Sequence, residues 1–202
     1  MPKISAVQRV ERRDSLVDAA RLVFIEKGFE AASISDIARM AGVSDGLLYR
    51  YFGSKRDLLL AVLTEFYERV IVDLEGQVAT SDGFEARLSA LVHRHVEVFV
   101  GDVDLCRLFI AEVRNFDEYV GSQAHELNRR YTAILMRILA EGVAEEKVSP
   151  AIDGRIVRDM LYGGIEHLAW RHIAAGHPLD VDHISTQISG LLLGGLQAMA
   201  RA

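Results

Sequence analysis

Residues 33–55, SISDIARMAGVSDGLLYRYFGSK, constrain the fold more than any other segment, because they contain two helical patterns that are each only about two turns long. Ser33 stands three residues before Asp36, the spacing of a capping box, which predicts a helix beginning at the next residue. Gly42 is placed to end that helix, and Ser44 offers the N-cap of the second. Such short helices do not persist alone in water, because helix nucleation is costly. They must therefore be docked on other helices.

The residues before this segment supply a docking surface on a helix expected from about residue 5 to residue 27. Its apolar stripe has the i, i+3, i+4, i+7, i+8 spacing and consists of Leu16, Ala19, Ala20, Val23 and Phe24. Gly28 ends this helix, with Phe29 as the hydrophobic contact of a Schellman motif. Ser54 can cap a longer helix that Lys55 opens. The pattern predicts a three-helix head of the helix-turn-helix type. Its last short helix, with outward N-terminal residues, suits the major groove of DNA.

The rest of the chain also predicts helices. Half of the 202 residues are apolar, only three are proline, and the apolar residues recur at helical spacing without a convincing strand. We therefore expect an all-α protein with two domains: a helix-turn-helix head over residues 1–55 and an antiparallel helical bundle over residues 56–202. The bundle is large enough to hold a ligand cavity. Its helices are expected at residues 55–77, 84–100, 105–115, 117–145, 153–175 and 182–201.

Charge is divided unevenly along the chain. The formal net charge is −6, yet residues 1–60 carry ten Lys or Arg against eight Asp or Glu. The acidity therefore belongs to the C-terminal part. A mildly basic head on an acidic body favours DNA contact at one end only, with salt-sensitive binding.

The segments AARLVFIEKGF and SISDIARMAGVSDGLLYRYFGSKRDLLLAVL together resemble the N-terminal signature of the TetR family of bacterial transcriptional regulators. This resemblance implies a homodimer that binds palindromic double-stranded operator DNA. It also implies a regulator, usually a repressor, that is released when a small hydrophobic effector enters the C-terminal domain. The expected function is therefore ligand-responsive regulation, and no enzymatic activity is expected.

The resemblance also implies DNA contacts at particular positions. Phosphate contacts are expected from Tyr49, Tyr51 and Lys55, and backbone or base contacts from Ser33 and Ser35. The residues expected to face base edges are Ser44, Asp45, Gly46, Leu47 and Arg50. Ordinary surface roles remain open for the tyrosines, Arg50 and Lys55, and capping already explains Ser33 and Ser44. Asp45 departs from the polar or basic residue usual there, so it either accepts from a cytosine amino group or serves as a first-turn helix residue.

Five glycines lie inside the last two expected helices, where each costs about 1 kcal/mol relative to alanine unless close packing compensates. They are Gly163, Gly164, Gly190, Gly194 and Gly195. His167, interpreted as a core or interface residue with a pocket role as the alternative, is grouped with the interface glycines. The family resemblance implies a dimer in which these helices of both subunits form a four-helix bundle. Relief of crowding within one subunit is the alternative.

The effector site is the least determined part. Candidate lining residues are Phe66, Tyr67, Phe99, Leu108, Phe109, Tyr131, Ile134, Leu135 and Trp170, although the same residues suit a plain core. DGLLYRYF, RYTAILMRILAEGV and GGIEHLAW more weakly resemble TetR members that respond to fatty acyl-CoA. For such a ligand, cations must meet the CoA phosphates. The candidates are Arg107, Arg114, Arg129, Arg130 and Arg137, and a solvated charged face explains them equally well.

Other chemistry is disfavoured. Residues 42–46 match G-x-S-x-G, but that nucleophile motif requires a preceding strand, and a helix is expected here. His93 and His95 diverge on a helix, so no metal or other cofactor is expected. The single Cys106 cannot form an intrachain disulfide, and a buried filler is favoured over a redox sensor.

No run of 18 apolar residues predicts a membrane span, and a cytoplasmic location is expected. The alternative function is a helical small-molecule-binding or scaffold protein with little DNA affinity, which Asp45 and the acidic balance favour.

Overall fold

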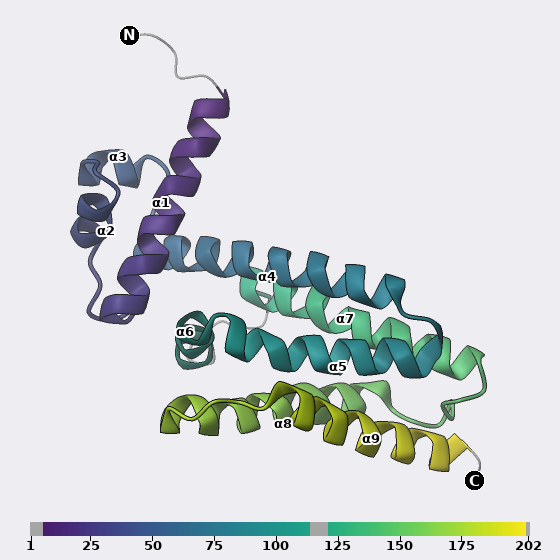
Figure 1. Ribbon diagram of the computed structural model, residues 1–202. Helices are drawn as coiled ribbons and strands as arrows, with labels where there is room; N and C mark the ends of the chain where they lie inside the picture. Colours follow the sequence, from purple (N-terminus) through teal and green to yellow (C-terminus); the bar gives the residue numbers. More distant parts are fainter. Residues whose placement is uncertain (1–5, 114–120, 201–202) are drawn as a thin grey trace. The chain divides into compact units, whose positions relative to one another are not determined.

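The computed structural model describes residues 6–113 and 121–200, and every regular element in these ranges is an α-helix (Figure 1). The helices are α1 (Ala6–Lys27), α2 (Ile34–Met40), α3 (Asp45–Tyr49), α4 (Lys55–Thr80), α5 (Gly83–Gly101), α6 (Val103–Val113), α7 (Gln123–Ala144), α8 (Gly154–Ala175) and α9 (Val181–Ala200). The predicted all-α class is confirmed.

The chain divides into two compact units. We call Met1–Phe66 with Leu108–His125 the head unit, and Tyr67–Arg107 with Glu126–Ala202 the body unit. The predicted domain boundary at residues 55 and 56 lies at the start of α4, whereas the division between the compact units falls inside that helix.

The core of the head unit follows the predicted apolar stripe. Leu16, Ala20, Val23 and Phe24 of α1 are almost completely buried. α2 packs against α1 and adds Ile37 and Ala38, and α3 packs against α2 and adds Leu48. The three helices bury one face each, so the two short helices are held by tertiary packing, as their length requires.

Local signals set the ends of these helices. The backbone N–H of Gly28 donates to the carbonyl of Phe24 at 2.9 Å, and the rings of Phe24 and Phe29 lie 5.4 Å apart, as the predicted helix end requires. Gly42 has φ +65°, a conformation that side chains with a Cβ rarely adopt, and it turns the chain between α2 and α3.

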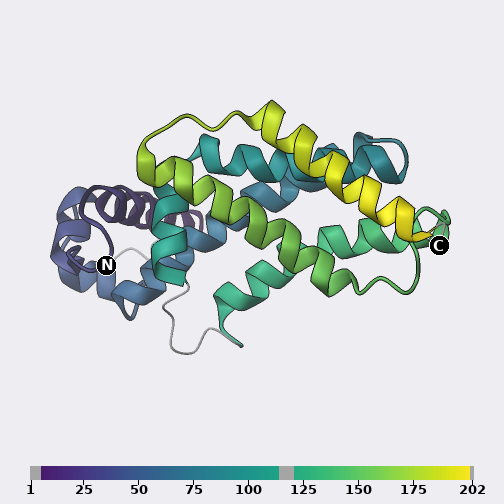
Figure 2. The ribbon, with the colours of Figure 1, turned by 90° about the horizontal axis from the view of Figure 1, so that it is seen from below.

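In the body unit, consecutive long helices run in opposite directions (Figure 1). α9, yellow in Figure 2, packs along α5, and α8 also contacts α5. The central residues of this bundle are fully buried and include Leu74, Leu88, Leu91, Val96, Leu105, Leu135 and Ile138. The predicted antiparallel helical bundle is therefore confirmed.

One predicted helix start was wrong. The sequence pattern placed it at residue 117, but α7 begins at Gln123. Gly121 has φ +87°, and the Ser122 hydroxyl accepts a hydrogen bond from the backbone N–H of His125 at 3.2 Å. A glycine in the left-handed region followed by a serine N-cap starts a helix directly after the serine, here at Gln123. Residues 117–120 themselves lie outside the described residues.

Candidate DNA-binding surface and effector site

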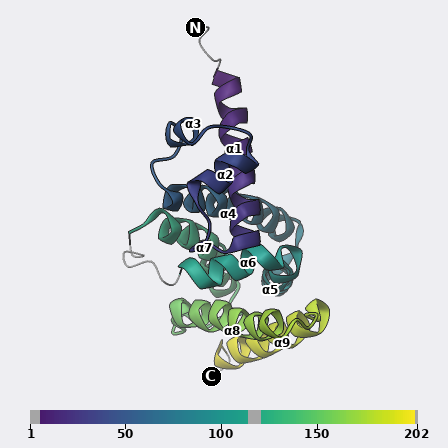
Figure 3. The same ribbon diagram turned by 90° about the vertical axis from the view of Figure 1, so that its left-hand side faces the viewer.

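α3 and its two caps, Ser44 and Arg50, contain six of the ten residues that were expected to meet DNA. Leu48, with no exposed surface, and Phe52, with 6% exposed, fix the inner side of this segment. Asp45, Gly46, Tyr49 and Arg50 are exposed on the remaining sides, and 55% of Tyr49 is accessible. Figure 3 shows α3 beside α2, the arrangement of a helix-turn-helix. Because the outward residues stand on a helix only five residues long, their directions depend on how its ends are held.

The Asp45 carboxylate is held from α2. The Ser35 hydroxyl donates to Asp45 Oδ2 at 2.5 Å, and Asp45 is in the first turn of α3. A carboxylate at that position interacts favourably with the positive end of the helix dipole. This contact ties the two helices of the motif together and gives Asp45 a first-turn role. The Ser44 hydroxyl accepts from the backbone N–H of Leu47 at 3.3 Å, which confirms the predicted N-cap.

The predicted capping box of α2 is also present. Ser33 Oγ accepts from the backbone N–H of Asp36 at 3.1 Å, and the Asp36 carboxylate accepts from the backbone N–H of Ser33 at 3.2 Å. Lys27 lies 2.8 Å from the same carboxylate. The hydrogen bond from Lys27, together with that from Ser33, lowers the pKa of Asp36 to about 2. The box therefore joins the last turn of α1 to the first turn of α2.

Lys55 has a role that its position in the sequence does not reveal. Its ammonium donates to three backbone carbonyls, those of Phe29 at 2.6 Å, Glu30 at 3.1 Å and Ala32 at 3.0 Å. Nζ also lies 4.5 Å from the centre of the Phe29 ring. All three ammonium donors are thereby used within the head unit. The predicted phosphate contact of Lys55 competes with these carbonyls and stays a prediction.

Tyr51 and Leu47 are half-buried beside a hollow of about 490 Å³ in the head unit. The other residues that line it come from α1 and are Gln8, Glu11, Arg12 and Ser15. Leu47 is therefore less accessible than Asp45 and Gly46 beside it, and its expected contact with base edges stays a prediction.

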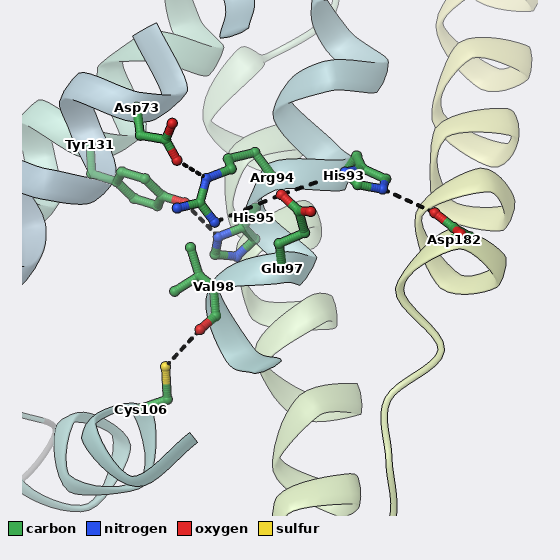
Figure 4. Close-up of polar contacts among 9 residues, drawn as sticks. All are labelled: Asp73, His93, Arg94, His95, Glu97, Val98, Cys106, Tyr131 and Asp182. Atoms are coloured by element: carbon green, nitrogen blue, oxygen red, sulfur yellow. Dashed lines mark hydrogen bonds and ion pairs between the residues drawn. The ribbon is translucent and has the colours of Figure 1, made fainter. Parts of the chain in front are cut away.

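In the body unit, four aromatic side chains from four helices meet inside the bundle. We call Tyr67 of α4, His95 of α5, Tyr131 of α7 and Tyr162 of α8 the aromatic cluster. His95 Nδ1 lies 2.7 Å from the Tyr131 hydroxyl, a contact drawn in Figure 4. The His95 and Tyr162 rings are 4.6 Å apart in an edge-to-face arrangement. Burial lowers the pKa of His95 to about 3 and raises the pKa values of both Tyr131 and Tyr162, so all three groups are neutral near pH 7.

Two polar atoms of the aromatic cluster have no hydrogen-bond partner among the described residues. They are His95 Nε2 and the Tyr162 hydroxyl oxygen, and both are buried. A buried polar group without a partner costs about 1–3 kcal/mol. Phenylalanine at position 162 would avoid that cost, so packing alone does not explain the Tyr162 hydroxyl. His95 is needed as the partner of Tyr131, but that contact uses Nδ1 only and leaves Nε2 unexplained.

The side chains proposed to line an effector cavity differ in how far they are exposed. Those that are buried are Tyr67, Phe99, Leu108, Tyr131, Ile134 and Leu135, and Phe66 is half-buried. Trp170 is 40% exposed, which groups it with the outer face of α8 rather than with the interior. The side chain of Phe109 is not among the side chains that the structure describes. Burial is shared by core residues and cavity linings, so membership of a ligand site stays a prediction for each.

A hollow of about 620 Å³ opens in the body unit beside the segment between α8 and α9. Its lining is mainly apolar and includes Phe99, Val103, Ile173 and Leu179. Arg107 is the arginine in this lining, and its half-exposed side chain lies 3.5 Å from Asp104. The hollow therefore combines an apolar wall with a cation, as a ligand with an apolar part and a phosphate would need.

The other candidate arginines lie on a solvated face. Arg129 pairs with Glu126 at 3.1 Å, Arg130 with Glu68 at 3.9 Å and Arg137 with Glu75 at 3.6 Å, all with at least about half of each side chain exposed. Arg114 lies outside the described residues. For these three pairs, the charged-face interpretation accounts for the contacts.

His93 and Cys106 make ordinary packing and polar contacts. His93 lies 3.1 Å from Asp182 of α9, whereas His95 faces Tyr131, so the two histidines diverge as expected (Figure 4). In residues 6–113 and 121–200, no three His, Cys, Asp or Glu side chains are grouped closely enough to hold a metal ion. Cys106 is buried, its thiol donates to the Val98 carbonyl at 3.3 Å, and burial raises its pKa to about 12. These features fit a packing role.

The outer face of α8 and α9 is apolar and exposed. Its large side chains include Ile156, Met160, Trp170, Leu191 and Met199, of which Leu191 is 77% accessible. A Cβ built on any of the five glycines of these helices would meet no described atom within 4 Å, apart from the adjacent residues and the backbone of its own helix. Crowding within one subunit therefore does not explain Gly163, Gly164, Gly190, Gly194 or Gly195. His167 is also exposed, on α8.

Comparison with known families agrees with this geometry. Residues 16–62, which run from within α1 through α2 and α3 into α4, match the family described as bacterial regulatory proteins, tetR family. Residues 81–196, more than half of the chain, match a tetracyclin repressor-like C-terminal domain. The chain belongs to the TetR family. It is therefore a DNA-binding transcriptional regulator, and the predicted helix-turn-helix head is confirmed.

Several relatives share nearly the full length of this TetR family regulator. The fatty acid metabolism regulator protein of Bacillus subtilis is 27% identical over 181 residues, which cover 90% of this chain and 93% of that protein. The HTH-type transcriptional repressor KstR2 of Mycolicibacterium smegmatis is 29% identical over 200 residues, which cover 94% of this chain and 92% of KstR2. Among solved structures, the regulator FadR from Bacillus subtilis in complex with stearoyl-CoA superposes with a TM-score of 0.82 at 27% identity, covering 90% of this chain and 98% of FadR.

In the described part of this TetR family regulator, no helix combines the length and the apolar character needed to cross a bilayer.

Sequence patterns did not reveal two features of this regulator: the backbone contacts of Lys55 and the unpartnered polar atoms of His95 and Tyr162. The Lys55 contacts join residues 23 to 26 positions apart, a distance at which helical periodicity carries no information. The polar atoms of His95 and Tyr162 were also missed. His95 stands four residues after Leu91 and four before Phe99 on the buried stripe of α5, which is a usable signal for a buried histidine.

Proposed function

We propose that this regulator is a dimeric repressor that leaves its operator when a long-chain fatty acyl-CoA binds the body unit. The observation that carries the proposal is the likeness to FadR in complex with stearoyl-CoA over 90% of this chain, with a TM-score of 0.82. The hollow with Arg107 supports it, because its apolar wall suits an acyl or pantetheine chain and its cation suits a phosphate. The proposed role needs operator DNA as partner, requires a cytoplasmic location, and involves no catalytic step.

Dimer formation is assigned to the outer face of α8 and α9. Exposed apolar side chains surround glycines that no atom of the same subunit crowds, so a second copy can approach the helix backbones closely. Two recognition helices in such a dimer would read half-sites about 34–36 Å apart, one turn of DNA. The expected operator is therefore a palindrome.

The test is fluorescence anisotropy of the full chain with labelled duplex DNA from immediately upstream of its own gene. Binding is measured at two salt concentrations with unlabelled competitor DNA present, because phosphate contacts make affinity fall with salt. Each titration is repeated with stearoyl-CoA and, as control, with CoA lacking an acyl chain. Tight binding that only stearoyl-CoA abolishes supports the proposal.

Binding that stearoyl-CoA leaves unchanged would discard the effector and retain the regulator. Absence of specific binding to upstream DNA would favour an operator elsewhere, and absence of binding to genomic DNA fragments would favour a helical scaffold with little DNA affinity.

A further inference from the structure

The aromatic cluster contains two buried polar atoms, His95 Nε2 and the Tyr162 hydroxyl oxygen, for which the described residues offer no hydrogen-bond partner. His95 and Tyr131 are bonded to each other at 2.7 Å, and Tyr162 packs against both rings, 4.6 Å from His95 and 5.5 Å from Tyr131. The cluster is thus a packed group of polar aromatic side chains inside a largely apolar bundle.

The protonation state of His95 follows from its surroundings. The imidazole is neutral, because burial holds its pKa near 3, so one ring nitrogen carries a proton and the other does not. If the Tyr131 hydroxyl donates to Nδ1, a single N–H at Nε2 remains without partner. If Nδ1 donates instead, both Nε2 and the Tyr131 hydroxyl proton remain unsatisfied. The first arrangement leaves fewer unsatisfied groups, so Nε2 is assigned as a donor.

Tyr162 supplies the second donor. Its hydroxyl is buried and, like His95 Nε2, has no partner in the part of the chain that the structure describes. Both donors are neutral, which disfavours a bound anion and favours a neutral acceptor oxygen. A carbonyl oxygen has two lone pairs and can accept from two donors at once.

Phe99 connects this cluster to the hollow of the body unit. The Phe99 ring lies 5.4 Å from the His95 ring and also lines the hollow that holds Arg107. On α8, Tyr162 precedes the lining residue Ala169 by seven residues, or about 10 Å along the helix axis. The pantetheine arm of an acyl-CoA can span such a distance between its phosphates and its thioester.

We propose that the thioester carbonyl oxygen of the acyl-CoA effector accepts hydrogen bonds from His95 Nε2 and the Tyr162 hydroxyl. The inference rests on the proposed acyl-CoA response and adds a residue-level basis for recognising the acyl thioester. The apolar chain then extends into the bundle, and the phosphates remain toward Arg107. Acyl thioesters are thereby distinguished from ligands of the same shape without a carbonyl.

The experiment compares two ligands and two proteins in a double-mutant cycle. The ligands are stearoyl-CoA and S-octadecyl-CoA, a thioether with the same chain and head group but no carbonyl oxygen. The proteins are the full-length wild type and Tyr162→Phe, with dissociation constants measured by isothermal titration calorimetry. Wild type should bind the thioester about tenfold more tightly than the thioether. Tyr162→Phe should reduce that ratio to about threefold, through weaker thioester binding alone, and should melt no lower than wild type.

The thioether is the internal control, because its affinity must be the same for both proteins. Equal binding of thioester and thioether by wild type would overturn the inference and leave the acyl-CoA response standing. A tenfold ratio that persists in Tyr162→Phe would also overturn the assignment of Tyr162. Failure of both ligands to bind wild type would overturn the proposed effector itself, and the inference with it.

Discussion

At the scale of single residues, Lys55 links three parts of the head unit. Its side chain starts on α4 and its ammonium binds the carbonyls that follow the end of α1, just before α2 begins. A cation at those carbonyls satisfies backbone acceptors of the loop between α1 and α2. The residue that the family resemblance connects with phosphate therefore also holds the head unit together.

Replacing Lys55 should measurably destabilise the protein. Lys55→Met removes three hydrogen-bond donors but keeps most of the apolar stem, so we expect a loss of about 1–3 kcal/mol in the free energy of unfolding. The matched control is Arg69→Met, which removes an exposed positive charge from the same helix. That variant should stay within about 0.5 kcal/mol of wild type in urea unfolding. Equal effects of the two substitutions would contradict the structural role of Lys55.

Arg50 tests base recognition without disturbing the fold. It is exposed at the C-cap of α3, so Arg50→Ala should weaken operator binding by about 1–3 kcal/mol and leave the melting temperature nearly unchanged. Arg69→Ala removes the same charge elsewhere and should have little effect. Anisotropy on operator and scrambled DNA provides the measurement. A loss of affinity that is equal on both DNAs would assign Arg50 to phosphate rather than to a base.

At the scale of the elements, the capping box of α2 contributes stability that depends on pH. The pKa of Asp36 falls from 3.8 in an unfolded chain to about 2 in the folded protein, so the folded state favours the ionised carboxylate. Its contribution is complete above pH 4 and is lost as the pH falls toward 2. Asp36→Asn should therefore destabilise the protein at pH 5, and the difference from wild type should shrink as the pH is lowered to 3. A difference that grows on acidification would contradict this sign.

Sequence patterns predicted the elements that local chemistry determines. The caps at Ser33 and Ser44 and the buried stripe of α1 were predicted and are confirmed, because each depends on neighbours within a few residues. The start of α7 was predicted too early, because apolar spacing outweighed the serine cap that follows Gly121. The bond between Ser35 and Asp45 and the aromatic cluster join separate helices, so periodicity within one helix could not reveal them.

At the scale of the whole molecule, the proposed dimer face makes the assembly testable. Leu191→Glu places a charge on the exposed face of α9 and should convert a dimer into a chain of 22.4 kDa in light scattering. It should also weaken operator binding, because a monomer reaches one half-site only. Val72→Glu is the control: Val72 is 70% exposed on α4, so the same charge should leave the dimer intact. Dimers that survive Leu191→Glu but not Val72→Glu would place the interface elsewhere.

The measurement that tests the account most directly is the coupling between DNA and acyl-CoA. Operator affinity is measured with and without stearoyl-CoA, and stearoyl-CoA affinity with and without operator, on the same full-length protein. Linkage requires the two ratios to be equal, and the proposed release predicts at least a tenfold weakening in each direction. If operator-bound and free protein bind stearoyl-CoA with the same affinity, the effector does not release the DNA, and the central claim is contradicted.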